Sequence, residues 1–82
     1  MKIVEAHQIP DGNVSPDIFR LPCVNCANKR YDKGIEYGVF ITRGKLFDIY
    51  FAYPTEWICK DENGEWLVLD DEEYQAEKGG GV

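Results

Sequence analysis

The sequence predicts a small α+β domain, built mainly on an antiparallel β-sheet of four or five strands with one or two short helices. Three observations support this fold class. The 82 residues are enough for one domain only. The second half of the chain alternates apolar and polar residues with the period of a strand. Gly44-Lys45 and Asn63-Gly64 interrupt this alternation with the residues that tight hairpins require.

The first part of the chain is expected to hold a strand, one helical turn and a loop. Residues 2–9 include β-branched residues and stop at a run of turn-forming residues. Ser15 and Pro16 suit the N-cap and the first position of a helix, which Pro22 limits to about one turn. Residues 22–36 are polar and irregular, and they predict a loop that carries two of the three cysteines.

Residues 37–43 and 46–53 are expected to form a hairpin closed by a two-residue type II′ turn at Gly44-Lys45. In this register Phe40 lies opposite Ile49. The hairpin then gathers four large apolar side chains on one face, which we expect to be buried: Phe40, Phe47, Ile49 and Phe51. The opposite face carries Arg43, Asp48 and Tyr50.

A second hairpin and a helix are expected to complete the domain. The Asn63-Gly64 turn predicts a hairpin in which Trp66 lies opposite Asp61. Residues 70–77 open with four acids, which stabilise the positive end of a helix, and they predict a short helix. The single domain is therefore expected to span residues 1–78, with residues 79–82 as a flexible tail.

The charge of the chain is unevenly distributed. The net charge is −6, and residues 61–77 hold eight acids without a Lys or Arg. An acidic end repels phosphate backbones, so we expect no nucleic-acid partner. The acids either form a solvated surface or a face that docks on a basic partner.

The sequence favours a cytoplasmic location. Its longest apolar stretches are far shorter than the ~20 residues that a membrane span requires, so we expect no membrane contact. Glu5 interrupts the N-terminal segment, which lacks the apolar run of a signal peptide. In this compartment the three cysteines are expected to stay reduced.

Both ends of the chain resemble a widespread group of short phage and prophage proteins, over about half of the sequence. The opening match comprises Val4-Glu5-Ala6, Gln8 and Asp11-Gly12-Asn13. The closing match comprises Tyr53-Pro54, Trp57-Ile58, Asn63-Gly64-Glu65, Val68 and Tyr74. Thr55-Glu56 stands where the group tends to have Gly-Asp, and the middle segment has no counterpart. The resemblance implies a phage or prophage origin, and with it the cytoplasm of a bacterial host cell. It also implies a strand, hairpin and helix, but it implies no reaction.

Two of the cysteines have the spacing of a metal knuckle. Two residues separate Cys23 from Cys26, which lets two thiolates bind one tetrahedral Zn²⁺. Cys59 and His7 are the remaining candidate ligands, and they complete a Cys₃His site if the first strand lies beside residues 56–60. Buried structural thiols are the alternative. A redox role is disfavoured because no βαβ pattern surrounds the pair.

No motif in the sequence predicts catalysis. The carboxylates lack any feature that separates an acid from a base, and no glycine-rich loop opens a helix. We therefore expect a non-catalytic binding protein that engages a host or phage protein, or a second copy of itself. The candidate contact residues are Tyr50, Trp66, Asp70, Asp71 and Glu73. Two alternatives remain: a zinc-stapled structural module, and a protein that sequesters a small nucleotide-like ligand through Arg30, Lys33, Arg43 and the tyrosines.

Overall fold

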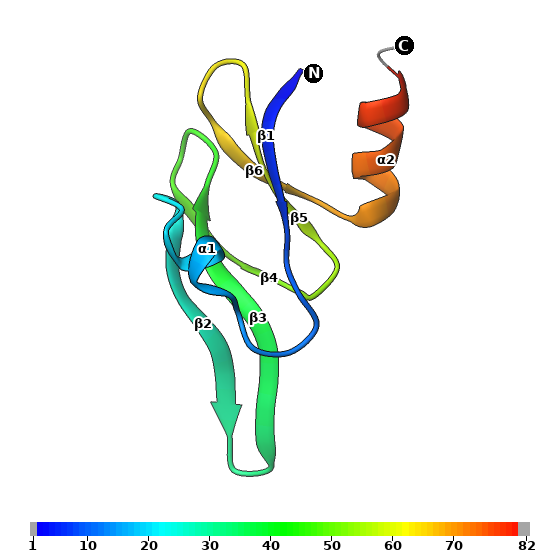
Figure 1. The fold of residues 1–82 in the computed structure, drawn as a ribbon. Helices are drawn as coiled ribbons and strands as arrows, with labels where there is room; N and C mark the ends of the chain where they lie inside the picture. Colours follow the sequence, from blue (N-terminus) through cyan, green and yellow to red (C-terminus); the bar gives the residue numbers. More distant parts are fainter. Residues whose placement is uncertain (1, 81–82) are drawn as a thin grey trace.

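The computed structural model describes residues 2–80, and this part of the chain contains six strands and two helices (Figure 1). The strands are β1 (Ile3–Gln8), β2 (Val24–Tyr31), β3 (Gly34–Arg43), β4 (Asp48–Ala52), β5 (Trp57–Asp61) and β6 (Trp66–Leu69). The helices are α1 (Pro16–Phe19) and α2 (Asp71–Gly80). All pairings are antiparallel, in the order β1-β5-β6 in one sheet (the terminal sheet) and β2-β3-β4 in the other (the central sheet). The α+β prediction is confirmed, with the strands divided between two sheets.

The expected loop over residues 22–36 is wrong, because it contains β2 and the start of β3. The register of β2 against β3 shifts twice, between Val24 and Cys26 and again between Ala27 and Lys29. Such bulges interrupt the two-residue period by which a strand is recognised in a sequence. Asn28 lies in the second irregularity at φ 58°, and its Oδ1 accepts a hydrogen bond from the backbone N of Gly38 at 3.2 Å.

The first hairpin forms, but its turn is longer than expected. Arg43 pairs with Asp48 and Phe40 with Phe51, so four residues close the hairpin instead of two. Gly44 and Phe47 both have left-handed backbone conformations in this loop, with φ of 70° and 55°. The predicted type II′ turn is therefore wrong.

Of the four side chains expected to be buried in this hairpin, Phe51 is buried and Phe40 is half-buried, but Phe47 and Ile49 are exposed, and the fully buried residues lie on the opposite face. Val39, Ile41 and Ala52 have no exposed surface, whereas 75% of Phe47 and 63% of Ile49 is exposed. Apolar residues occupy both faces of β3 and β4, so alternation alone does not identify the buried face. Tyr50, expected on the exposed face, packs against the core.

Phe40 and Phe51 cover the outer face of the central sheet. Their rings meet edge to face with centroids 4.7 Å apart, and the ammonium of Lys29 lies 4.2 Å from the centroid of Phe51. Gly38 leaves room for this ring, because a Cβ there would collide with the ring of Phe51 and the carbonyl of Ala52. Close packing against this ring therefore explains why residue 38 is a glycine.

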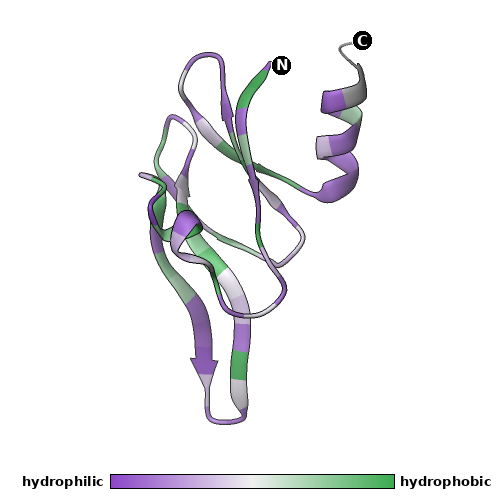
Figure 2. Cartoon of the chain, viewed as in Figure 1, coloured by the Kyte–Doolittle hydropathy of each residue, from purple (hydrophilic) through white to green (hydrophobic). Residues whose placement is uncertain are grey.

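The main core lies between the two sheets and under α1. Its buried members are Ile9, Ile18, Leu21, Cys23, Val39, Ile41, Ala52 and Ile58. Pro16 opens α1 and Ser15 precedes it as expected, although the Ser15 side chain makes no capping hydrogen bond. Figure 2 shows that α2 and the outer half of β2 are mainly hydrophilic.

The second hairpin is one residue out of the predicted register. Trp66 pairs with Lys60 instead of Asp61. The carboxylate of Asp61 accepts hydrogen bonds from the backbone N of Asn63 and of Glu65, both at 2.9 Å, and Gly64 has φ 85°. A three-residue loop with a left-handed glycine explains the shift. Because a one-residue shift exchanges the faces of a strand, Trp66 lies on the same face as Ile58, towards the core.

Helix α2 follows the second hairpin, as the sequence predicts. The ring of Trp57 stacks on Tyr74 at 3.9 Å, and Trp57 Nε1 donates a hydrogen bond to Asp71 Oδ1 at 2.9 Å. The helix extends through Gly80, so it overlaps the expected tail by two residues, and residues 81 and 82 lie outside the described residues. Within residues 2–80, neither helix has the length and apolar character that crossing a membrane requires.

Candidate functional site

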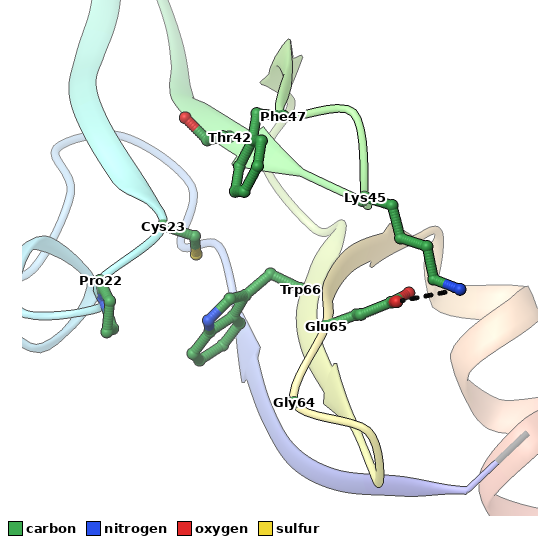
Figure 3. Close-up of a pocket in the computed structure, with 9 residues that line it drawn as sticks. Pro22, Cys23, Thr42, Lys45, Phe47, Gly64, Glu65 and Trp66 are labelled. Carbon is green, nitrogen blue, oxygen red and sulfur yellow. Dashed lines mark ion pairs between the residues drawn. The ribbon is translucent and has the colours of Figure 1, made fainter.

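A pocket of about 560 Å³ opens where the β3–β4 loop meets the β5–β6 loop (Figure 3). We call it the Phe47–Trp66 pocket, and its walls are Pro22, Cys23, Thr42, Gly44, Lys45, Phe47, Gly64, Glu65 and Trp66. Figure 3 shows Phe47 and Trp66 reaching this space from different strands and loops. The Lys45–Glu65 ion pair lies at one end, away from Cys23 and Pro22. Segments far apart in the sequence therefore build one site.

Backbone hydrogen bonds hold the walls of the pocket together. The backbone N of Gly44 donates to the carbonyl of Trp66 at 3.0 Å, which ties the two hairpin loops to each other. The backbone N of Thr42 donates to the carbonyl of Cys23 at 2.8 Å, which fixes the segment before β2. A pocket with such walls is formed before any ligand arrives, as small-molecule sites usually are.

The polar side chains of the pocket already have partners within the chain. Thr42 Oγ1 accepts a hydrogen bond from Asn25 Nδ2 at 2.8 Å, and Lys45 Nζ lies 3.8 Å from Glu65 Oε1. Burial raises the pKa of the Cys23 thiol to about 11, and the negative charge of Glu5 adds to this, so the thiol is neutral at pH 7. The surface left for a ligand is aromatic and apolar.

Phe47 is the most unusual of these residues. It is a bulky side chain at positive φ, a conformation that costs about 1–2 kcal/mol for a residue other than glycine. Leu46, Phe47 and Ile49 are 86%, 75% and 63% exposed, and we call these three residues the apolar rim. Neither burial nor backbone preference explains an aromatic residue at position 47.

The structure separates the five candidate contact residues into two groups. Asp70, Asp71 and Glu73 lie together at the start of α2, and each accepts a hydrogen bond from within the chain. Trp66 and Tyr50 lie between the sheets and pack against the core.

Of this second pair, Trp66 lines the pocket and Tyr50 does not. Tyr50 lies under the Arg43 guanidinium at 3.9 Å, and its hydroxyl donates to Glu56 Oε2 at 3.3 Å. Burial raises the pKa of Tyr50, and the charge of Glu56 adds to this. Tyr50 is thus fixed by its neighbours rather than offered to a partner.

The four candidate zinc ligands do not converge. β1 does lie beside β5, but His7 pairs with Ile58 while Ala6 pairs with Cys59. Successive side chains point to opposite faces of a sheet, so His7 and Cys59 face away from each other. Cys23 is buried and Cys26 is exposed on β2. Within the described residues, no group of three or more His, Cys, Asp and Glu side chains has a geometry that could hold a metal ion.

The basic residues of the nucleotide hypothesis also lie apart. Arg30 pairs with Ile35 and Lys33 lies in the β2–β3 turn, whereas Arg43 ends β3. The eight steps along the strand from Ile35 to Arg43 span roughly 26 Å at about 3.3 Å per residue. One small ligand does not bridge this distance.

The sequence does not predict the pocket, because its alternating pattern places Phe47 on a buried strand face. One signal was present: Leu46-Phe47 follows Gly44-Lys45 in a turn, where polar residues are usual. No family model, curated protein or solved structure matches the chain. Its function must therefore be inferred from its own surface.

Proposed function

We propose that this chain is a small, non-catalytic binding protein of phage or prophage origin, and that its partner is a host protein, a phage protein or a second copy. The observation that carries this proposal is the apolar rim, which places three large apolar side chains in solvent within four consecutive positions. Exposed apolar groups of this kind mark interaction sites in small soluble domains. The phage origin rests on the resemblance at the two ends of the chain.

The apolar rim is a better candidate than the acidic start of α2. Asp70, Asp71 and Glu73 are engaged in hydrogen bonds that hold the helix and Trp57 in place. Reversing their charges would therefore damage the fold as well as any interface. The rim side chains make no comparable contribution, because most of their surface is in water.

The rim alone is too small to hold a partner. Burying three large apolar side chains contributes on the order of 5–9 kcal/mol. Association costs an estimated 4–15 kcal/mol in lost freedom of motion. The partner must therefore cover neighbouring surface too, and β4, the last strand of the central sheet, offers an unpaired edge beside the rim.

The test is a double substitution, Leu46→Ser with Ile49→Ser, in the full chain. We expect the variant to lose a partner that the wild-type chain captures from bacterial lysate, and to keep its circular dichroism spectrum and melting temperature. If the partner is a second copy, sedimentation should show a dimer for the wild type and a monomer for the variant.

Two control variants make the result specific. Phe19→Ser changes an apolar side chain on α1 that is also exposed, and it should leave capture intact. Glu72→Lys changes the charge of α2 outside the hydrogen bonds at its start, and it should also leave capture intact. Capture that survives the double substitution, or that Glu72→Lys abolishes, would show that the rim is not the interface.

A further inference from the structure

We infer that the Phe47–Trp66 pocket binds a planar, uncharged aromatic small molecule, held between the rings of Phe47 and Trp66. This site shares Phe47 with the apolar rim proposed above as a protein interface, but it uses the cavity between the two loops, whereas Leu46 and Ile49 do not line it. The inference does not depend on whether a protein partner exists.

The size of the pocket suits such a ligand. Its volume of about 560 Å³ lies within the usual range for small-molecule sites, roughly 300–1,000 Å³. A neighbouring pocket of about 340 Å³ shares Trp66 but is bordered by Arg43, Lys45 and Asp48. A third, of about 820 Å³, is lined by six consecutive residues of the β2–β3 turn and has no opposing wall. The Phe47–Trp66 pocket alone among these three combines two aromatic walls from different hairpins.

The chemistry of the walls selects an uncharged ligand. The charges of Lys45 and Glu65 compensate each other, and the hydroxyl of Thr42 is already hydrogen-bonded. The thiol of Cys23 is buried and uncharged at pH 7, so it adds no charge to the walls of the pocket. A phosphate or carboxylate would therefore find no unpaired cation here. A flat aromatic ring instead finds two aromatic faces, which favour stacking or edge-to-face contacts.

The backbone at Phe47 supports the same conclusion. A bulky side chain at φ 55° is disfavoured, and a glycine would close the same loop without strain. Strain that the surrounding structure maintains is often found at ligand sites. Here the strained residue contributes almost nothing to the core, and its ring forms one wall of a cavity. Binding of an aromatic ligand by this ring explains why a phenylalanine occupies the strained, exposed position 47.

The two tryptophans provide a direct test. Trp66 lines the pocket, whereas Trp57 lies against Tyr74 and donates its indole N–H to Asp71. We propose to titrate the ¹⁵N-labelled full chain with indole and to follow both indole N–H signals, assigned with Trp66→Phe. The Trp66 signal should shift and saturate while the Trp57 signal stays in place. Cyclohexanol, which is not planar, and indole-3-acetate, which is an anion, should each bind at least about tenfold more weakly.

Three variants complete the test. Phe47→Ala removes one wall at an exposed position and should weaken indole binding by about tenfold or more. Phe19→Ala removes a phenylalanine that is exposed elsewhere and should leave the affinity unchanged. Leu46→Ser with Ile49→Ser should keep indole binding even where it abolishes capture of a protein partner, so the two proposals fail separately. Equal shifts at both tryptophans, no saturation, or an unchanged affinity in Phe47→Ala would overturn the inference.

Discussion

At the scale of single residues, the three cysteines have three different environments. Cys23 is buried in the core between the sheets, Cys59 is buried on β5, and Cys26 is exposed on β2. The spacing of Cys23 and Cys26 is that of a metal knuckle, but the chain enters a strand with a bulge between them. The two thiols therefore do not share a centre. A spacing read from the sequence does not distinguish a closed knuckle from an irregular strand.

The buried thiols predict a loss of stability at alkaline pH. Burial raises the pKa of Cys23 and of Cys59 from 9.0 to about 11. Between pH 9 and 11 the unfolded chain therefore binds fewer protons at these thiols than the folded chain does. The free energy of unfolding should fall as pH rises through this window, by at most about 1.4 kcal/mol per thiol for each pH unit. More than about one pH unit below the reference pKa of 9.0, the two thiols should contribute almost no pH dependence.

Urea unfolding at pH 8 and pH 10.5 would measure this effect. The double variant Cys23→Ala with Cys59→Ala should lose less stability than the wild type between the two pH values. Cys26→Ala, at the exposed thiol, should behave as the wild type does. An identical pH response of the wild type and the double variant would show that the buried thiols do not cause the alkaline loss.

Residue burial was the least predictable feature of the central sheet. The sequence places apolar residues at consecutive positions, Val39-Phe40-Ile41 on β3 and Ile49-Tyr50-Phe51-Ala52 on β4. Both faces therefore look suitable for a core: the ring of Phe51 is buried on the outer face, but the main core forms on the opposite one. The smaller residues are buried because two sheets approach each other there, which is information that no single strand contains.

At the scale of secondary-structure elements, local chemistry was a good guide. Turn-forming residues located β1 and both hairpins, and Pro16 located α1. The register was less predictable, because it depends on loop length: four residues close the first hairpin, and the second has a left-handed glycine. β2 was missed because its two bulges remove the periodicity by which strands are found.

The start of α2 is a capping box, and its removal is expected to lower the stability of the domain. Asp70 Oδ1 accepts a hydrogen bond from the backbone N of Glu73 at 2.7 Å, and Glu73 Oε1 accepts one from the backbone N of Asp70 at 3.2 Å. Asp70→Ala should therefore lower the free energy of unfolding by about 1 kcal/mol. It should also reduce helical circular dichroism, and it should loosen the stacking of Trp57 on Tyr74.

Two variants control this prediction. Asp70→Asn keeps an oxygen that can accept the hydrogen bond and should remain close to the wild type. Glu72→Gln changes an acid in the same turn but leaves both bonds of the capping box in place. If Glu72→Gln cost as much as Asp70→Ala, the general charge of the turn would stabilise the helix, and the capping box would not.

At the scale of the whole molecule, the first strand shares a sheet with the last two strands, and the three middle strands form the other sheet. β1 pairs with β5, although almost fifty residues separate the end of β1 from the start of β5. The second hairpin therefore belongs to the sheet that contains β1, and the first hairpin belongs to the other sheet. The two hairpin loops meet through the Gly44–Trp66 backbone hydrogen bond and the Lys45–Glu65 ion pair, and the pocket lies where they meet. Local sequence patterns predict each hairpin, but they do not predict that the two hairpin loops contact each other. The candidate site therefore could not be predicted, even though most of its residues lie in predicted elements.

Two isoleucines test this arrangement of the sheets. Ile58 has no exposed surface and lies in the core, whereas Ile49 is mostly exposed. Ile58→Ala should lower the free energy of unfolding by about 2–5 kcal/mol, the usual range for large-to-small core substitutions. Ile49→Ala should cost less than about 1 kcal/mol, which is the span of strand preferences.

The sequence pattern taken alone predicts a large cost for Ile49→Ala, so urea unfolding of the two variants distinguishes the two arrangements. A domain of this size has a small margin of stability, roughly 5–15 kcal/mol, and Ile58→Ala could leave too little folded protein to measure. Ile58→Val avoids this difficulty and should still cost about 0.5–1.5 kcal/mol. If Ile49→Ala cost about 2 kcal/mol or more, as a core truncation does, the outer face of the central sheet around Ile49 would be buried in solution. The apolar rim would then be part of a core or an oligomer interface, and Phe47 would be unavailable to an aromatic ligand.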